Sequence, residues 1–172
     1  ASTYISKFSK LLRKLLESEE QITTLDNEID MLKLYIELTQ IRYEGKFDFS
    51  IVVSDDLTKE DILIPNLLLQ PLVENAIIHG LGPKSEKGFL KIEFEQKDEN
   101  LICCVDDDGI GRKAALKNQK NKEHNSKAME ITTERLQLFD SSSTMKIIDK
   151  FDDHQKSLGT KVIITLPLKY NW

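Results

Sequence analysis

The sequence predicts an α+β protein, a two-layer sandwich built on a mixed sheet and preceded by a helical segment at the amino terminus. Two observations carry this prediction. The hydrophobic period changes from helical spacing to alternation after Gly45. From there the expected order is strand, helix, two strands, a long loop, helix and two strands, which differs from the strict alternation of a parallel doubly wound fold. We therefore expect helices gathered on one face of a mixed sheet.

The composition limits the class of protein. The chain has 172 residues, with 24 Lys and Arg against 29 Asp and Glu, a formal net charge of −5. This length suits one domain with a helical appendage, and the acidic balance argues against a nucleic-acid partner. No apolar run reaches the roughly 20 residues of a membrane-spanning helix, and the first residues do not resemble a signal peptide. These features favour a cytoplasmic location.

The two cysteines, Cys103 and Cys104, are neighbours in the sequence. Adjacent cysteines cannot join distant segments and cannot supply the four ligands of a structural zinc site. The sequence therefore predicts neither a disulfide scaffold nor a zinc module.

Two amphipathic helices are expected in the first 43 residues. Apolar residues recur every three or four positions from Tyr4 to Leu16. A capping box at Thr23–Asp26 begins a second helix, which has two apolar faces and so suggests two neighbours. One neighbour is the following domain; the other is a second copy of the chain or another helix of the same chain.

Alternation at residues 47–53 predicts a strand, and helical spacing returns from Ile64 to His79, before Gly80, Gly82 and Pro83. Further strands are expected at 89–95, 101–105, 145–148 and 162–166, with a helix at about 128–139. Residues 112–127 are polar with almost no apolar anchor, so we predict a long functional loop there.

The first polar cluster lies on the helix that ends at Gly80. Asn75 and His79 are four positions apart and share one helix face, with Glu74 beside them. Such a face can offer an oxygen ligand to Mg²⁺, a contact to phosphate and a carboxylate that handles a proton. Solvated polar positions near a helix end explain the same residues equally well.

The second cluster is Asp106-Asp107-Asp108-Gly109-Ile110-Gly111, directly after a strand. The spacing of a calcium loop fails, because the required acidic residue does not follow. A buried Asp at a strand end could instead accept a hydrogen bond from an exocyclic amine, and the glycines would let a ligand approach the backbone. A third segment, Leu158–Lys161, is most simply a turn.

The order of these segments resembles the ATP-binding region of sensor histidine kinases, most closely those of the LytS type within the GHKL superfamily. Residues 64–80, Ile-Pro-Asn-Leu-Leu-Leu-Gln-Pro-Leu-Val-Glu-Asn-Ala-Ile-Ile-His-Gly, match the N box, and Asp107–Gly111 matches the G1 box. Thr133–Leu136 is similar to the helix after the ATP lid, and Gly159-Thr160 to the turn before the last strand. The resemblance implies a Bergerat sandwich in residues 44–172, with residues 1–43 ending a dimerisation and phosphoacceptor region.

The resemblance also implies roles for individual residues in binding ATP and Mg²⁺. Asn75 would be the metal ligand, Glu74 the acid/base or water-positioning residue, and His79 a phosphate contact. Asp107 would accept from the adenine amino group, and residues 112–127 would form the lid. The remaining implied nucleotide contacts are Gly109, Gly111, Arg112, Ala128, Met129 and Thr160.

The chain departs from the family pattern at three places. Ile78 stands where relatives carry a lysine beside the phosphates, and Pro71 replaces a first asparagine of the N box. The glycine-rich G2 box is reduced to Ser126–Met129, with Ala128 at an expected glycine. Losing a lysine removes a charge-assisted phosphate contact, for which Arg112, Lys113, Lys117 or Lys127 could compensate.

The implied function is transfer of the ATP γ-phosphoryl group to a histidine upstream of this chain, and from there to a response regulator. The implied whole protein is a membrane-anchored homodimer. None of His79, His124 and His154 lies in the family's acceptor motif. A pseudokinase or dimer scaffold with weakened catalysis is the alternative. An anti-sigma serine kinase is a third possibility, which the sequence Gln-Pro-Leu-Val-Glu-Asn at residues 70–75 disfavours.

Overall fold

The fold is described from a computed structural model, which covers residues 2–17, 19–117 and 119–172, with the side chains of 119–126 excluded. Its centre is a five-stranded sheet in the order β2-β4-β5-β7-β6. The pair β2–β4 is parallel and the other three pairs are antiparallel, so the predicted mixed sheet is confirmed. The strands are β2 (Phe47–Val53), β4 (Gly88–Lys97), β5 (Asn100–Asp107), β6 (Thr144–Phe151) and β7 (Ser157–Pro167).

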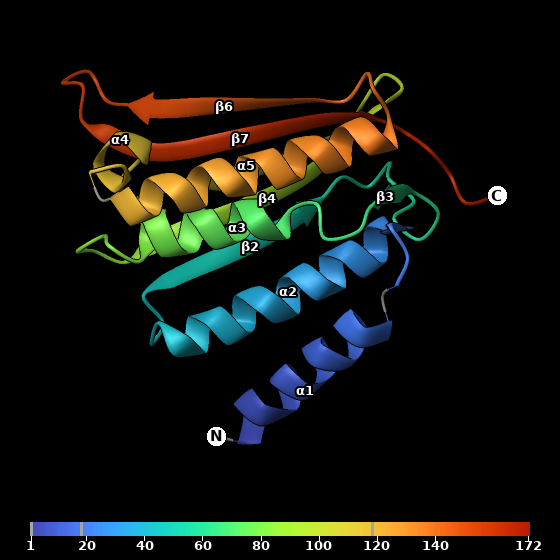
Figure 1. Cartoon of the computed structure of the whole chain (residues 1–172), viewed down its shortest axis with the longest axis horizontal. Coiled ribbons are helices and arrows are strands. Elements are labelled where there is room, and N and C mark those ends of the chain that lie inside the picture. Colours follow the sequence, from blue (N-terminus) through green and yellow to red (C-terminus); the bar gives the residue numbers. More distant parts are fainter. Residues whose placement is uncertain (1, 18, 118) are drawn as a thin grey trace.

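The long helices lie on one face of this sheet, as Figure 1 shows. They are α2 (Leu25–Arg42), α3 (Gln70–Asn75) with its π-helical continuation η1 (Ala76–Leu81), and α5 (Gln119–Phe139). The strands alternate as expected: Leu90, Ile92 and Phe94 of β4 are at most 1% exposed because they face the helices. The two-layer sandwich is therefore confirmed.

The helix α1 (Ser2–Glu17) lies outside the sandwich, against α2 (Figure 1). Leu11 of α1 forms a second apolar cluster with Met31, Leu34 and Leu38 of α2. The other face of α2 packs into the main core through Leu25, Ile29, Leu32 and Ile36. One chain thus covers both apolar faces of α2.

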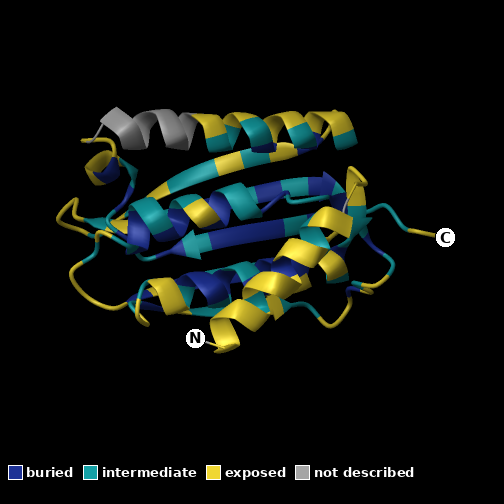
Figure 2. Ribbon diagram, turned by 60° about the horizontal axis from the view of Figure 1, so that its bottom comes forward, coloured by how far each residue is buried: buried dark blue, intermediate teal, exposed yellow. Residues whose placement is uncertain are grey.

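Much of α1 stays exposed on its outer side (Figure 2). Ile5, Phe8, Leu12 and Leu16 recur at helical spacing there and are 43–79% exposed.

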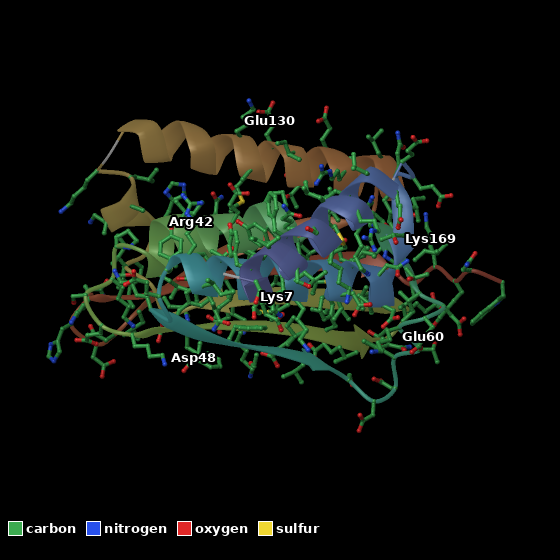
Figure 3. All side chains as sticks on the ribbon, turned by 90° about the horizontal axis from the view of Figure 1, so that it is seen from below. Lys7, Arg42, Asp48, Glu60, Glu130 and Lys169 are labelled. Atoms are coloured by element: carbon green, nitrogen blue, oxygen red, sulfur yellow. The ribbon has the colours of Figure 1, made fainter. Side chains whose placement is uncertain are left out.

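No helix among the described residues is long and apolar enough to cross a bilayer. Charged side chains such as Asp48, Glu60 and Glu130 point outward from the ribbon (Figure 3).

The helix predicted from Ile64 begins later, at Gln70. Leu63–Pro65 forms instead a short strand, β3, which pairs antiparallel with β1 (Ile22–Thr24). Proline lacks a backbone N–H and disfavours helical geometry in the residue before it, so Pro65 suits the end of an extended segment. Pro71 falls in the first turn of α3, where its missing N–H leaves no bond unmade.

The prediction of a long loop at 112–127 is wrong. Arg112–Ala115 forms the short helix α4, and α5 already begins at Gln119 instead of near Ala128. The segment contains neither glycine nor proline, and Lys, Gln, Glu and Ala favour a helix even without apolar anchors. Asn118, and the side chains of Ser126 and His124, lie outside the described residues.

Candidate functional site

A cavity of about 250 Å³ opens where α3, η1, α4 and α5 meet the ends of β5 and β7. It collects residues from several segments that are far apart in the sequence. The lining residues are Leu72, Asn75, Ala76, His79, Gly80, Val105, Asp107, Gly111, Arg112, Ala115, Leu116, Met129, Thr160 and Val162.

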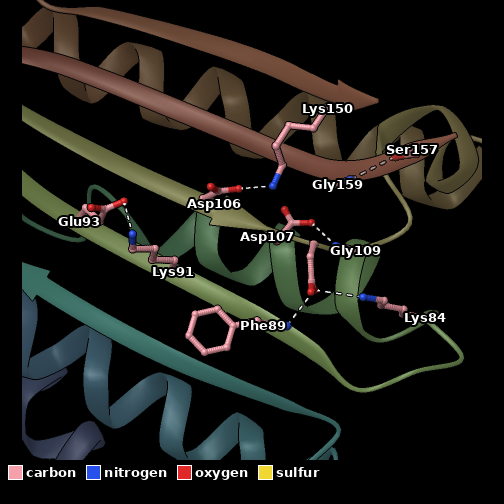
Figure 4. Close-up of polar contacts among 11 residues, drawn as sticks. Lys84, Phe89, Lys91, Glu93, Asp106, Asp107, Gly109, Lys150, Ser157 and Gly159 are labelled. Carbon is pink, nitrogen blue, oxygen red and sulfur yellow. Dashed lines mark hydrogen bonds and ion pairs between the residues drawn. The ribbon is translucent and has the colours of Figure 1, made fainter. Parts of the chain in front are cut away.

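Asp107, the last residue of β5, is the buried acid of this cavity. Its side chain is 5% exposed, and its Oδ1 accepts a hydrogen bond of 2.8 Å from the backbone N–H of Gly109 (Figure 4). Burial raises the pKa of Asp107 to about 6, although the Gly109 hydrogen bond and the charge of Lys150 oppose this shift. A buried carboxylate with spare acceptor capacity therefore faces the cavity.

The glycines beside Asp107 are required by close packing. A Cβ on Gly109 would lie 2.3 Å from the carbonyl carbon of Gly80, and a Cβ on Gly80 would lie 3.0 Å from Oδ1 of Asp107. The backbone N–H of Ile110 donates to the Gly80 carbonyl at 3.0 Å. Gly111 has a φ of +83° and lines the cavity, whereas Gly109 holds the loop against η1 and is not a lining residue.

The helix α3–η1 supplies one wall of the cavity. Its second half is π-helical, and the N–H of Gly82 donates to the Ile77 carbonyl at 2.7 Å. Single π turns occur often at functional sites, and this one carries His79 and Gly80 into the cavity. Among the described residues, Nδ2 of Asn75 is buried without a hydrogen-bond partner, so a ligand oxygen would satisfy it.

Glu74 does not join this group. Its side chain is exposed and is not part of the cavity lining, although the sequence analysis placed it with Asn75 and His79. Glu74 lies instead toward α2. Burial raises the pKa of Tyr35 to about 12, and the charge of Glu74 adds to that shift. The position on α3 explains this difference, because adjacent helix residues point about 100° apart.

Of the remaining residues predicted to contact the nucleotide, some line the cavity and others do not. Met129 and Thr160 line the cavity, while Ala128 does not. Arg112 lines it too, but its guanidinium makes two hydrogen bonds, of 2.8 and 2.6 Å, to the carboxylate of Asp149 on β6. Of the cations expected to replace the missing lysine, Arg112 is thus already paired with a carboxylate.

The apolar wall of the cavity was not predicted from the sequence. Leu72 and Ala76 fall within the helix predicted from Ile64 to His79, and Val105 and Val162 fall within predicted strands. They meet because β5 and β7 pair in a register that places Val105 opposite Val162 and Asp107 opposite Thr160. The available signal was a valine two positions before Asp107 and another two after Thr160, since residues two apart on a strand share a face.

The arrangement suits a planar ligand with an amino group at one end and an anionic tail. Apolar walls accept a ring, Asp107 accepts from an amine, and Asn75, His79 and Arg112 add polar groups. No group of three or more His, Cys, Asp or Glu side chains among the described residues could hold a metal ion. A cation would therefore need ligand oxygens besides Asn75, as Mg²⁺ does when it binds with nucleotide phosphates.

Comparison with solved structures defines the class of this fold. The catalytic domain of the histidine kinase ThkA matches 87% of this chain and 97% of its own, with a TM-score of 0.59 and 15% identity. Full-length ShkA bound to AMPPNP matches 98% of this chain and 36% of its own (TM-score 0.61, 15% identity). ThkA in complex with the response regulator TrrA matches 98% and 49% (TM-score 0.52, 15% identity). The architecture is that of histidine kinase catalytic domains.

The relatives found by sequence similarity define the family more narrowly than the fold does. Residues 1–47 match the family model "Histidine kinase". The sensor protein LytS of Oceanobacillus iheyensis is 37% identical over 107 residues, which are 62% of this chain and 18% of LytS. The sensor histidine kinase YesM of Bacillus subtilis is 26% identical over 98% of this chain and 28% of its own length. The chain thus spans less than a third of these relatives, and its resemblance to LytS-type sensor histidine kinases is confirmed.

Proposed function

We propose that this chain carries the ATP-binding catalytic domain of a sensor histidine kinase of the LytS type. The observation that carries the proposal is the buried Asp107 at the end of an apolar cavity, with Gly80 and Gly109 packed tightly around it. The nucleotide site lies in residues 44–172, and residues 1–43 end the dimerisation and phosphoacceptor region.

In this proposal Asp107 accepts a hydrogen bond from the adenine amino group, and the ring lies between the apolar walls. Asn75 is the protein ligand of Mg²⁺, and His79 contacts the phosphates. When bound, Mg²⁺ supplies charge neutralisation on the phosphate oxygens. Glu74 is the acid/base or water-positioning residue in this proposal, and it would act from the exposed side of α3 and not from the cavity lining.

The rest of the reaction lies outside this chain. The γ-phosphoryl group passes to a histidine upstream of Ile5, and from there to a response regulator, the kind of partner bound to ThkA in its complex. The whole protein is a membrane-anchored homodimer, and this chain is part of its cytoplasmic portion.

A nucleotide-binding pseudokinase or dimer scaffold is the second candidate. Ile78 stands at the place of a lysine, Ala128 at the place of a glycine, and Arg112 is paired with Asp149. The missing lysine and the paired Arg112 weaken the stabilisation of charge on the transferring phosphoryl group, and the Cβ of Ala128 obstructs a close approach to the backbone.

Labelling with γ-³²P-ATP separates the two candidates. A kinase should label a longer chain that includes the upstream acceptor helix, and the label should be lost in acid, because phosphohistidine is acid-labile. Residues 1–172 alone should stay unlabelled, since catalysis requires a histidine in line with the γ-phosphate. Nucleotide binding without labelling of the longer chain would identify a pseudokinase. Acid-labile label on residues 1–172 alone would overturn the upstream acceptor.

A further inference from the structure

The turn that precedes α3 has an unusual backbone. Leu67 has a φ of +56°, in the left-handed region that residues with a Cβ disfavour. Such a conformation persists when surrounding contacts hold it in place. In this protein those contacts come from two ionisable side chains on two different helices.

The first is Glu28 of α2. Its carboxylate is 2% exposed and accepts hydrogen bonds from the backbone N–H of Leu67 at 2.9 Å and of Leu69 at 3.2 Å. Each oxygen takes one of these bonds. Glu28 is therefore a buried carboxylate whose described hydrogen bonds all go to the backbone of this turn.

The second is Arg135 of α5. One of its terminal nitrogens donates to the backbone carbonyl of Leu67. The backbone N–H of Leu67 thus donates to a side chain of α2, and its carbonyl accepts from a side chain of α5. The two helices hold the turn from both sides.

The turn sets the start of the helix that lines the cavity. Leu69 is the N-cap residue of α3 and makes no side-chain capping bond of its own. Glu28 accepts the backbone N–H of Leu69 from another element, a bond that a glutamate in the first turn makes in a capping box, and burial raises the pKa of Glu28 to about 7. Asn75 lies five residues after Gln70, the first residue of α3, which is roughly 8 Å along the helix, and His79 lies one turn further.

The side chain of Leu67 contacts a further part of the molecule. It packs against the cluster of Leu11, Met31, Leu34 and Leu38, where α1 rests on α2. Leu67 is therefore in contact with the helical segment by its side chain and with the start of α3 by its backbone.

We propose that Glu28 and Arg135 are positioning residues that fix the Leu67 turn, and through it the α3–η1 helix at the nucleotide cavity. This inference rests on the proposed function only in naming the ligand of the cavity as a nucleotide.

The test compares Glu28→Gln with Glu37→Gln. Gln keeps the size of Glu28 but turns an NH₂ group toward a backbone N–H, so one buried bond is lost. We expect Mg-ADP to bind about tenfold more weakly, and amides of residues 70–81 to exchange faster with solvent. Glu37 is on the same helix and pairs with Lys7 of α1, so Glu37→Gln should change neither quantity.

Arg135 gives a second, independent series. Arg135→Lys keeps a donor for the Leu67 carbonyl, whereas Arg135→Met removes it, so Lys should retain most of the affinity that Met loses. Because both residues act on one turn, the effects of Glu28→Gln and Arg135→Met should combine less than additively. If Glu28→Gln does not fold, the two Arg135 variants still test the proposal.

A lower melting temperature alone is what a merely structural role would give. If Glu28→Gln and Arg135→Met melt earlier, yet bind Mg-ADP and exchange at residues 70–81 like the parent, the proposal is overturned. If the parent itself does not bind Mg-ADP, the proposed function fails, and the exchange of residues 70–81 in the free protein still decides whether the turn positions the helix.

Discussion

At the scale of single residues, Asp107 combines features that its sequence context suggested only in part. The acid and glycines at a strand end pointed to recognition of an amine. The raised pKa and the packing of Gly80 against its carboxylate follow from burial, which depends on segments far apart in the sequence. Glu74 shows the converse, because a residue grouped with Asn75 by sequence lies on another side of the helix.

The pKa of about 6 predicts how nucleotide affinity depends on pH. Only the ionised carboxylate of Asp107 is free of a proton that competes with the adenine amine for its oxygens. Affinity for ADP without metal should therefore rise with pH and level off above about 6, with a loss approaching tenfold per unit well below it. Calorimetric titrations at pH 5, 6, 7 and 8 measure this.

Glu95→Gln is the control for this pH dependence, because Glu95 is exposed on β4 opposite Ile102 and does not line the cavity. It should keep the pH profile of the parent. A flat profile in the parent would show that the ionisation of Asp107 does not govern binding.

At the scale of elements, periodicity predicted the strands and most helices, because one face of each is buried in a single core. It failed where local and tertiary signals compete. Leu63–Pro65 shares helical spacing with the residues after it, yet it pairs with β1, a partner about 40 residues away. Residues 112–127 have no apolar stripe, yet their helix propensity and the continuation into Met129–Phe139 extend α5.

The resemblance implies that residues 112–127 form a lid, and we predict that nucleotide binding orders this segment. Between Arg112 and Lys117 only Ala115 is buried, whereas Thr132 and Leu136 anchor the later part of α5. In the free protein, amides of 112–127 should exchange faster than those of 130–139, and a non-hydrolysable ATP analogue should slow them. Equal protection of both segments without nucleotide would mean that this region does not act as a lid.

At the scale of the whole molecule, the exposed side of α1 bears on assembly. Ile5, Phe8, Leu12 and Leu16 form an apolar stripe, the kind of surface that packs against another helix. We predict concentration-dependent dimers in sedimentation experiments. Phe8→Glu with Leu12→Glu should leave a folded monomer, because neither residue belongs to the buried clusters.

Lys10→Glu on the same helix is the control for charge, since Lys10 is exposed and not apolar. Monomers of the parent chain at every accessible concentration would contradict dimerisation through α1.

The cavity beside Asp107 should bind an adenine nucleotide, and calorimetry with Mg-ADP measures this binding. The parent should bind with measurable heat, and at a hundred times its dissociation constant ADP should stabilise the fold by about 2.7 kcal/mol. Asp107→Asn should lose ADP binding with or without Mg²⁺. Asn75→Ala should lose mainly the gain in ADP affinity that Mg²⁺ provides. No heat and no change in melting temperature at millimolar Mg-ADP would contradict the claim.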